Sequence, residues 1–188
     1  RSSLGIWDGR RLAEVQVRAR PRPELGDIVL GGAGSSKLWF LDYRGRVGLA
    51  DPVGRVVRMF DAEGRRPAGG QSRLTGSFAR AAWYATSTGV GRVSEEGRSR
   101  LIVPSLPRPP GPLSGGPDGN LWVAARRGPW LFRVSPSGAV ARFALDLPAH
   151  AALNDVTRDT RRGALWIACA HPRAVLKVPL PELRSKMP

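Results

Sequence analysis

Tryptophan returns at a nearly constant interval along this chain of 188 residues, each time inside a short apolar run. The four runs are KLWFLD (37–42), AAWYAT (81–86), NLWVAA (120–125) and ALWIAC (164–169). The distances between Trp39, Trp83, Trp122 and Trp166 are 44, 39 and 44 residues. A period of about 40–45 residues is typical of β-propellers, in which each repeat forms one four-stranded blade. The spacing predicts an all-β propeller of four-stranded antiparallel blades, with these indoles packed between adjacent blades.

Each copy of the repeat continues beyond its tryptophan. A second strand follows, then a turn, then a strand that alternates apolar and polar residues, as a half-buried strand does. The second strand is expected at 46–52, 90–96, 131–137 and 175–181, and the alternating strand at 55–60, 98–104 and 139–145. Gly54, Gly97 and Gly138 mark the turns between these strands. Weaker inner strands precede each tryptophan, at 27–32, 73–78, 112–116 and 154–160.

The repeat divides a single domain, 1–188, into about four blades and an N-terminal half blade. The blades are expected at about 24–60, 67–104, 107–147 and 149–181, with the half blade at 1–18. The last blade ends after its third strand, whereas RLAEVQV (11–17) is an outer strand without a partner. If that strand paired with the last blade as its outer strand, the chain would close into a small ring without exposed sheet edges. The chain starts at Arg1 without an initiator methionine, which favours an open arc cut from a larger propeller. Both alternatives stay open.

Charge and composition narrow the classes of partner. The net charge is +15, and 27 of the 30 basic residues are arginine (30 less three lysines). A basic surface attracts anionic ligands or partners, but the arginines are scattered and no RNA-binding signature is present, so no specific nucleic-acid partner is expected. No apolar run has the length of a membrane helix, and no signal peptide precedes the repeats, which favours the cytoplasm. The single cysteine, Cys169, excludes an internal disulfide and is predicted to be a small buried residue.

The third copy carries a specific resemblance. GGPDGNLWVAARRGPWLFRVSPSGAVARFALDLP (115–148) resembles the repeat of the virginiamycin B lyase (streptogramin lyase) family, and RVGLADPVGRVVRMF (46–60) is similar to the second half of that repeat. The resemblance implies a propeller and, for the archetype, a magnesium-dependent lyase that linearises a cyclic depsipeptide, streptogramin B, and so confers antibiotic resistance. The family's acidic residues after the tryptophan strand match Asp42, Thr86, Ala125 and Cys169 here. Only Asp42 is acidic, which puts magnesium-dependent catalysis in doubt.

A second resemblance is shorter. LNDVTRDTRRGALWIA (153–168) is similar to an Asn-Asp strand of gluconolactonase and regucalcin propellers. That resemblance implies a divalent cation at Asn154, with Asp155 beside it, and a metal-dependent lactonase.

Topology predicts where a site would lie. In a propeller, the loops from an outer strand to the next inner strand share one face with the loops between the second and third strands, and ligands bind there around the axis. The first set of loops includes Glu24, Arg108, His150 and Asn154, and the second includes Asp42, Arg44, Thr88, Arg126, Arg127, His171 and Arg173.

His150 and His171 are the candidate catalytic residues, because neutral imidazole serves as a base or metal ligand near neutral pH; the alternative is two loop histidines that each make one backbone hydrogen bond. Asn154 and Asp155 are the candidate metal ligands. The candidate ligand-binding residues are Asp42, Arg126, Arg127, Trp130 and Arg173, since guanidinium groups grip carboxylates and phosphates in bidentate fashion. The alternative for the arginines is that they are simply solvated.

Three functional hypotheses follow. The first is a scaffold that presents a basic mouth to a small-molecule or anionic ligand, or to a protein partner. The second is the magnesium-dependent depsipeptide lyase, and the third is the lactonase. An open arc also permits self-association through its sheet edges.

Overall fold

The structure is a computed structural model that describes residues 3–7, 12–16, 25–30, 37–42, 46–51, 56–63, 74–77, 81–116 and 118–180. Every secondary-structure element within these ranges is a β-strand, which confirms the prediction of an all-β fold. Within the same ranges, no helix has the length and apolar character needed to cross a membrane. Glu24, Arg44 and the predicted turn glycine Gly54 lie outside the described residues.

Four antiparallel sheets follow one another along the described part of the chain. The first contains β3 (Leu25–Leu30), β4 (Leu38–Asp42), β5 (Arg46–Asp51) and β6 (Val56–Asp61). The second contains β7 (Leu74–Ser77), β8 (Ala81–Ala85), β9 (Val90–Ser94) and β10 (Ser99–Val103). The third contains β11 (Pro110–Gly115), β12 (Leu121–Ala125), β13 (Trp130–Val134) and β14 (Val140–Ala144). The fourth contains β15 (Ala152–Asp159), β16 (Ala164–His171) and β17 (Ala174–Pro179).

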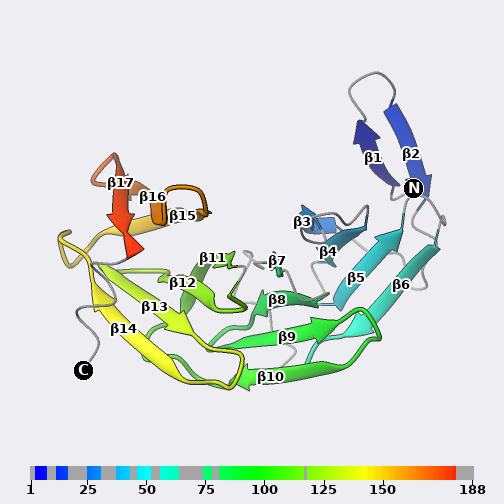
Figure 1. Cartoon of the computed structure of the whole chain (residues 1–188), viewed down its shortest axis with the longest axis horizontal. Coiled ribbons are helices and arrows are strands. Elements are labelled where there is room, and N and C mark those ends of the chain that lie inside the picture. Colours follow the sequence, from blue (N-terminus) through cyan, green and yellow to red (C-terminus); the bar gives the residue numbers. More distant parts are fainter. Residues whose placement is uncertain are drawn as a thin grey trace.

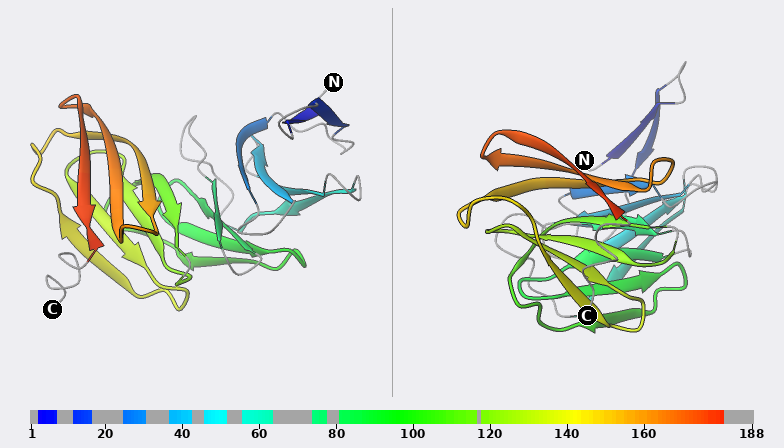
Figure 2. Two further views of the ribbon diagram at one scale, coloured as in Figure 1. Left: turned by 45° about the horizontal axis from the view of Figure 1, so that its top comes forward. Right: turned by 60° about the vertical axis from the view of Figure 1, so that its left-hand side comes forward.

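The sheets are arranged as an open arc (Figure 1). The inner strands β3, β7, β11 and β15 contact one another in sequence order, and β6, β10 and β14 lie on the convex side. A two-stranded sheet of β1 (Ser3–Trp7) and β2 (Leu12–Gln16) lies at one end of the arc, whereas β17 lies at the other (Figure 2). The structure therefore has the arc and not the ring. The strand β2 does not complete the fourth sheet, because it pairs with β1.

The recurring tryptophans occupy equivalent places in successive sheets. Each lies on the second strand of its sheet, and the residues opposite on the third strand are Leu49, Arg92, Arg133 and Lys177. Three of them pack against the next sheet: Trp39 against Leu74 and Tyr84, Trp83 against Leu121 and Phe132, and Trp122 against Leu165 and Ile167. Their exposed fractions are 0%, 0% and 4%. The prediction that these three indoles form the core between blades is confirmed.

Trp166 is the exception, and the prediction that it is buried between two blades is wrong. Its register within β16 is that of the other three, yet its side chain is only half-buried. The reason is that no described sheet follows β15–β17, so the face that carries Trp166 has no neighbour among the described residues. Lys177 lies across the ring instead, with its Nζ 5.8 Å from the ring centroid.

Two of the predicted turn glycines are needed for their backbone conformation. Gly97 and Gly138 have φ of 89° and 95°, a region that residues with a Cβ rarely adopt. Each donates its N–H to a carbonyl three residues back, on Ser94 and Ser135. These turns fix the connection between the third and fourth strands of their sheets. The predicted burial of Cys169 is also confirmed.

Candidate functional site

One face of the arc gathers the loops that the sequence predicted to form a site. We call it the loop face, and it comprises residues 86–89, 104–109, 126–129, 146–151 and 171–173. Backbone hydrogen bonds join its loops in order. Leu106 N donates to Thr88 O (2.7 Å), Arg126 N to Pro109 O (2.9 Å) and Gly128 N to Ala151 O (2.9 Å). Loops from three successive sheets are therefore held in one continuous, ordered surface.

The loop 126–129 presents the clearest pair of cationic groups on this face. Arg126 and Arg127 are adjacent and exposed, and backbone hydrogen bonds anchor the loop on both sides of them. Gly128 closes the loop with φ of 86°. Because the backbone is fixed, the two guanidinium groups need to lose only side-chain freedom when they bind an anion. Arg173 is also exposed, in the corresponding loop of the last sheet.

The charged side chains of the loop face are mostly positive. Its described charged residues are Arg108, Arg126, Arg127, Asp146 and Arg173, and it also carries the two histidines; all of these side chains are exposed. Asp146 is thus the single acidic group set against four arginines within those loops. A surface of this balance attracts anions and repels cations.

Trp130 lies at the start of β13, beside this loop, and its ring is already engaged. The guanidinium carbon of Arg142 sits 4.8 Å from the ring centroid, a cation–π contact. The half-buried indole also packs against the core between the second and third sheets. The contact with Arg142 was missed by the sequence reasoning, because the alternating pattern of β14 shows only that Arg142 leaves the core.

His150 and His171 come close together in the topology. Ala152 of β15 pairs with His171 of β16, so His171 lies opposite a position two residues after His150. Both side chains are exposed. The ring Nδ1 of His171 lies 2.9 Å from the carbonyl oxygen of the preceding residue, Ala170. This is the single backbone hydrogen bond expected if His171 is a loop histidine without a catalytic role.

Asp42 occupies the position that matches a family carboxylate, but it is fully buried at the end of β4. Its two carboxylate oxygens accept hydrogen bonds from Arg46, Oδ1 from the backbone N (2.7 Å) and Oδ2 from Nε (2.8 Å). Thr86, at the equivalent place in the second sheet, accepts from the backbone N of Gly89 through its Oγ1 (2.9 Å). Both side chains therefore hold the hairpin that follows their own strand. Asp155 and Asn154 are exposed near the start of β15, and Asp155 Oδ1 accepts from Val156 N (2.9 Å).

The described residues do not fit a resident metal ion. Nowhere among them do three or more histidine, cysteine, aspartate or glutamate side chains gather closely enough to hold one. A magnesium or calcium site in a protein takes several oxygen ligands, and the two exposed side chains at 154–155 supply too few. We therefore derive no chemical step through a metal.

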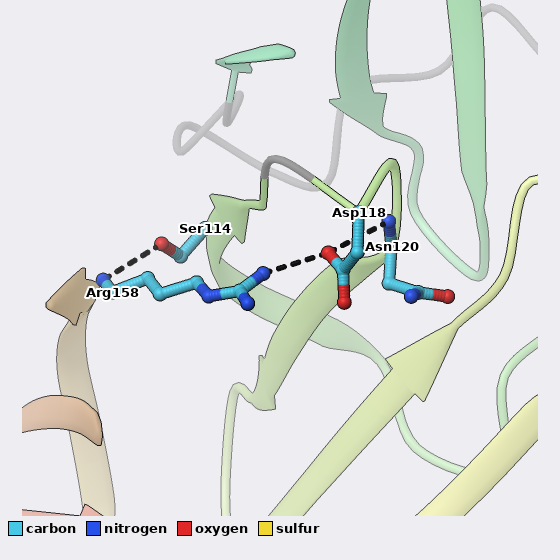
Figure 3. A network of polar contacts seen from close by, with 4 residues as sticks. All are labelled: Ser114, Asp118, Asn120 and Arg158. Atoms are coloured by element: carbon cyan, nitrogen blue, oxygen red, sulfur yellow. Dashed lines mark hydrogen bonds and ion pairs between the residues drawn. The ribbon is translucent and has the colours of Figure 1, made fainter. Parts of the chain in front are cut away.

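The opposite face of the arc carries a polar network that joins the third and fourth sheets (Figure 3). Arg158 Nη1 on β15 donates to Asp118 Oδ1 (2.7 Å), and Arg158 N donates to Ser114 Oγ (3.1 Å). Asn120 N also reaches Asp118 Oδ1 (3.3 Å). Burial by itself would raise the pKa of the Asp118 carboxyl, but hydrogen bonds from Asn120 and Arg158 and the charge of Arg158 outweigh it, so the pKa is lowered.

The same network explains the GPDGN run of the third copy. A Cβ on Gly116 would overlap the Arg158 guanidinium where it now lies, so glycine leaves room for the ion pair. Gly119 has φ of 75° and closes the turn by donating its N–H to Gly116 O (2.9 Å). The sequence reasoning recognised the turn but missed the ion pair, since Asp118 and Arg158 are 40 residues apart.

Sheets of antiparallel strands that radiate from inner strands to a convex outer edge define the class: a β-propeller. Solved propellers of known activity share the fold. The chain is 17% identical to a streptogramin B lyase structure over 95% of this chain and 62% of that one, with a TM-score of 0.68. It is 19% identical to a catalytically inactive histidine-to-alanine variant of virginiamycin B lyase from Staphylococcus aureus with quinupristin, over 95% of this chain and 63% of that one (TM-score 0.67).

A third similar structure is an auxiliary nutrient binding protein from Bacteroides ovatus, 8% identical over 84% of this chain and 39% of that one, with a TM-score of 0.63. At these identities the similarity shows the propeller fold, and the chain spans less than two thirds of the length of the lyases. No protein-family model and no curated protein matches the sequence.

Proposed function

We propose that the chain is a binding scaffold whose loop face takes an anionic ligand, with Arg126 and Arg127 as its principal contacts. The observation that carries the proposal is the anchored loop 126–129, which holds two adjacent exposed guanidinium groups on a face with four arginines and one acidic residue. Guanidinium groups bind carboxylates and phosphates through paired charged hydrogen bonds. Arg173 is exposed in the corresponding loop of the last sheet, on the same face. A similar propeller structure is a nutrient binding protein, which supports binding as a use of this fold.

A matched pair of double variants tests this proposal. Arg126→Gln/Arg127→Gln removes two exposed, adjacent charges from the loop face. Arg161→Gln/Arg162→Gln removes two exposed, adjacent charges from the turn on the opposite face, so the change in net charge is the same. Calorimetric titration with citrate, inorganic phosphate and a polyglutamate peptide at low salt should show binding to the parent. The loop-face variant should lose at least about tenfold in affinity, and the control less than about threefold.

Two results would refute the proposal. Equal losses in the two double variants would mean that only net charge is sensed. If the parent shows no binding to any of the three probes at low salt, the surface binds no anion of these classes.

An elimination reaction of the streptogramin lyase type is the second candidate. The strand register favours it, because it brings His150 and His171 to neighbouring positions on the loop face. One imidazole would take a proton from the carbon next to the one that carries the ester oxygen, the C–H electron pair would form the alkene, and the bond between that second carbon and the oxygen would break to release the carboxylate. The proton on the imidazole, the carboxylate and the new alkene account for all atoms. The mass of the linearised depsipeptide then equals that of the ring, whereas a lactonase adds one water.

Mass spectrometry of a streptogramin B incubated with the chain distinguishes these reactions. Elimination gives an isomer of the substrate, and His150→Ala or His171→Ala should lower its rate at least about a hundredfold. Unchanged rates in both variants would remove the histidines from the reaction. The gain of a water, lost in Asn154→Ala, would favour the lactonase instead.

A further inference from the structure

The arginines of the loop face are arranged along a line of bonded loops. Backbone hydrogen bonds join the loop before β11 to the β12–β13 loop, and the β12–β13 loop to the loop before β15. That last loop leads into a strand whose first residue pairs with His171, at the start of the β16–β17 loop. Each of these loops connects two described strands. We call Arg108, Arg126 and Arg127 the first basic cluster; Arg173 follows it further along the line.

The first basic cluster and Arg173 are held at a fixed separation. Arg126, Arg127 and Arg173 occupy the same loop in adjacent sheets, and packed sheets lie about 10 Å apart. The loop face contains six prolines: Pro104, Pro107, Pro109, Pro129, Pro148 and Pro172. Each proline restricts its own backbone, so the loops keep this separation without a ligand. A compact anion such as phosphate or citrate is shorter than the separation and contacts one of the two positions at a time.

An extended polypeptide with acidic side chains matches both the separation and the chemistry. An extended chain advances about 3.3 Å per residue, so carboxylates three or four residues apart reach from the first basic cluster to Arg173. Carboxylate is a group that guanidinium binds in bidentate fashion. Between the two positions lie the exposed imidazoles of His150 and His171. An imidazole donates or accepts a hydrogen bond, as the N–H and C=O groups of a bound peptide require.

The composition of the loop face favours a peptide over a nucleic acid. Its residues include no phenylalanine, tyrosine or tryptophan. Trp130, just outside it, is half-buried and in contact with Arg142. Proteins that bind single-stranded nucleic acids stack the bases on aromatic side chains, and the loop face has none to offer.

We propose that the ligand of the loop face is an acidic polypeptide segment in extended conformation. One group of its carboxylates binds Arg126 and Arg127, and another, three or four residues away, binds Arg173. This inference rests on the anion binding proposed above and adds the chemical class and shape of the ligand. Exposed ion pairs contribute little one at a time, so the affinity comes from engaging both positions with one chain.

Two peptides of identical composition test the spacing: acetyl-EEAAEE-amide and acetyl-AEEEEA-amide. In extended conformation, the centres of their two glutamate pairs are about 13 Å and about 7 Å apart, respectively. Calorimetric titration at low salt should show that the parent binds the first peptide at least about threefold more tightly. Arg173→Gln should remove this preference. The matched control, Arg161→Gln, changes one exposed charge on the opposite face and should keep it.

The loop-face double variant separates this proposal from the one on which it rests. Arg126→Gln/Arg127→Gln should weaken both peptides at least about tenfold, because both need the first basic cluster. If it weakens neither, anion binding by this loop is wrong. If it weakens both but the parent binds the two peptides equally, or if the preference survives Arg173→Gln, only the extended arrangement is wrong. Tighter binding of a thymidine hexanucleotide than of the first peptide would assign the face to nucleic acid and overturn the peptide proposal.

Discussion

Replacing Trp83 with alanine should destabilise the chain far more than the same change at Trp166. Trp83 is fully buried and packs on Leu121 and Phe132 of the next sheet. An indole removes about 150–250 Å² from water, worth about 4–6 kcal/mol at about 25 cal/mol per Å². Core substitutions of Phe or Trp by Ala cost about 3–5 kcal/mol. We expect a loss of about 4 kcal/mol in the free energy of unfolding.

Trp166→Ala should cost about 1–2 kcal/mol, because the indole is only half-buried and no sheet covers it among the described residues. Both variants delete the same side chain, so effects on the unfolded chain largely cancel in the comparison. Urea unfolding followed by circular dichroism gives both values. If Trp83→Ala does not fold, the two Trp→Phe variants should show the same order. Equal losses would refute the inference that burial between sheets distinguishes these residues.

Three further predictions concern pH, backbone space and the thiol. The lowered pKa of Asp118 stabilises the fold above about pH 4 and is lost as the pH falls through the folded value, so Asp118→Asn should be less stable than the parent at pH 7, and urea titrations should show this gap narrowing toward pH 2. Gly89→Ala places a Cβ against a backbone carbonyl and should lower stability by at least about 2 kcal/mol in thermal unfolding, whereas Gly163→Ala, with open space but φ of 58°, should cost about 1 kcal/mol. Burial raises the pKa of the Cys169 thiol, so a disulfide reagent at pH 8 should label the folded chain much more slowly than the urea-unfolded chain, and equal rates would contradict its burial.

The sheets could be predicted from the sequence because their signals are local and repeated. The tryptophan period located the second strand of each of the four larger sheets, and Gly97 and Gly138 marked the turns between the third and fourth strands of two of them. The exposure of Trp166 could not be predicted in this way. Each repeat shows what a sheet presents to its neighbour, but only the three-dimensional arrangement shows whether the neighbour is present.

The loop face was predictable to a similar extent. The strand order alone predicted that Arg126, Arg127, His150 and His171 lie on one face. In a propeller, the loops between the second and third strands lie on the same face as the loops from an outer strand to the next inner strand. The partner of Asp42 had a signal that was overlooked: an arginine four residues later, across a tight hairpin, satisfies a buried carboxylate. Ion pairs between sheets leave no such local pattern, because loop lengths and sheet packing decide which distant residues meet.

Four residues of the run behind the lyase resemblance have structural roles in this chain. Gly116 leaves space for Arg158, Asp118 binds that arginine, Gly119 turns the chain, and Trp122 packs on the following sheet. A chain that must fold as a propeller keeps these residues whatever it binds, so the resemblance transfers the fold but not a reaction. Binding has to be decided on the loop face, where the chain differs from the family pattern. For that reason, changes confined to residues 126–129 should alter anion affinity while leaving the free energy of unfolding almost unchanged.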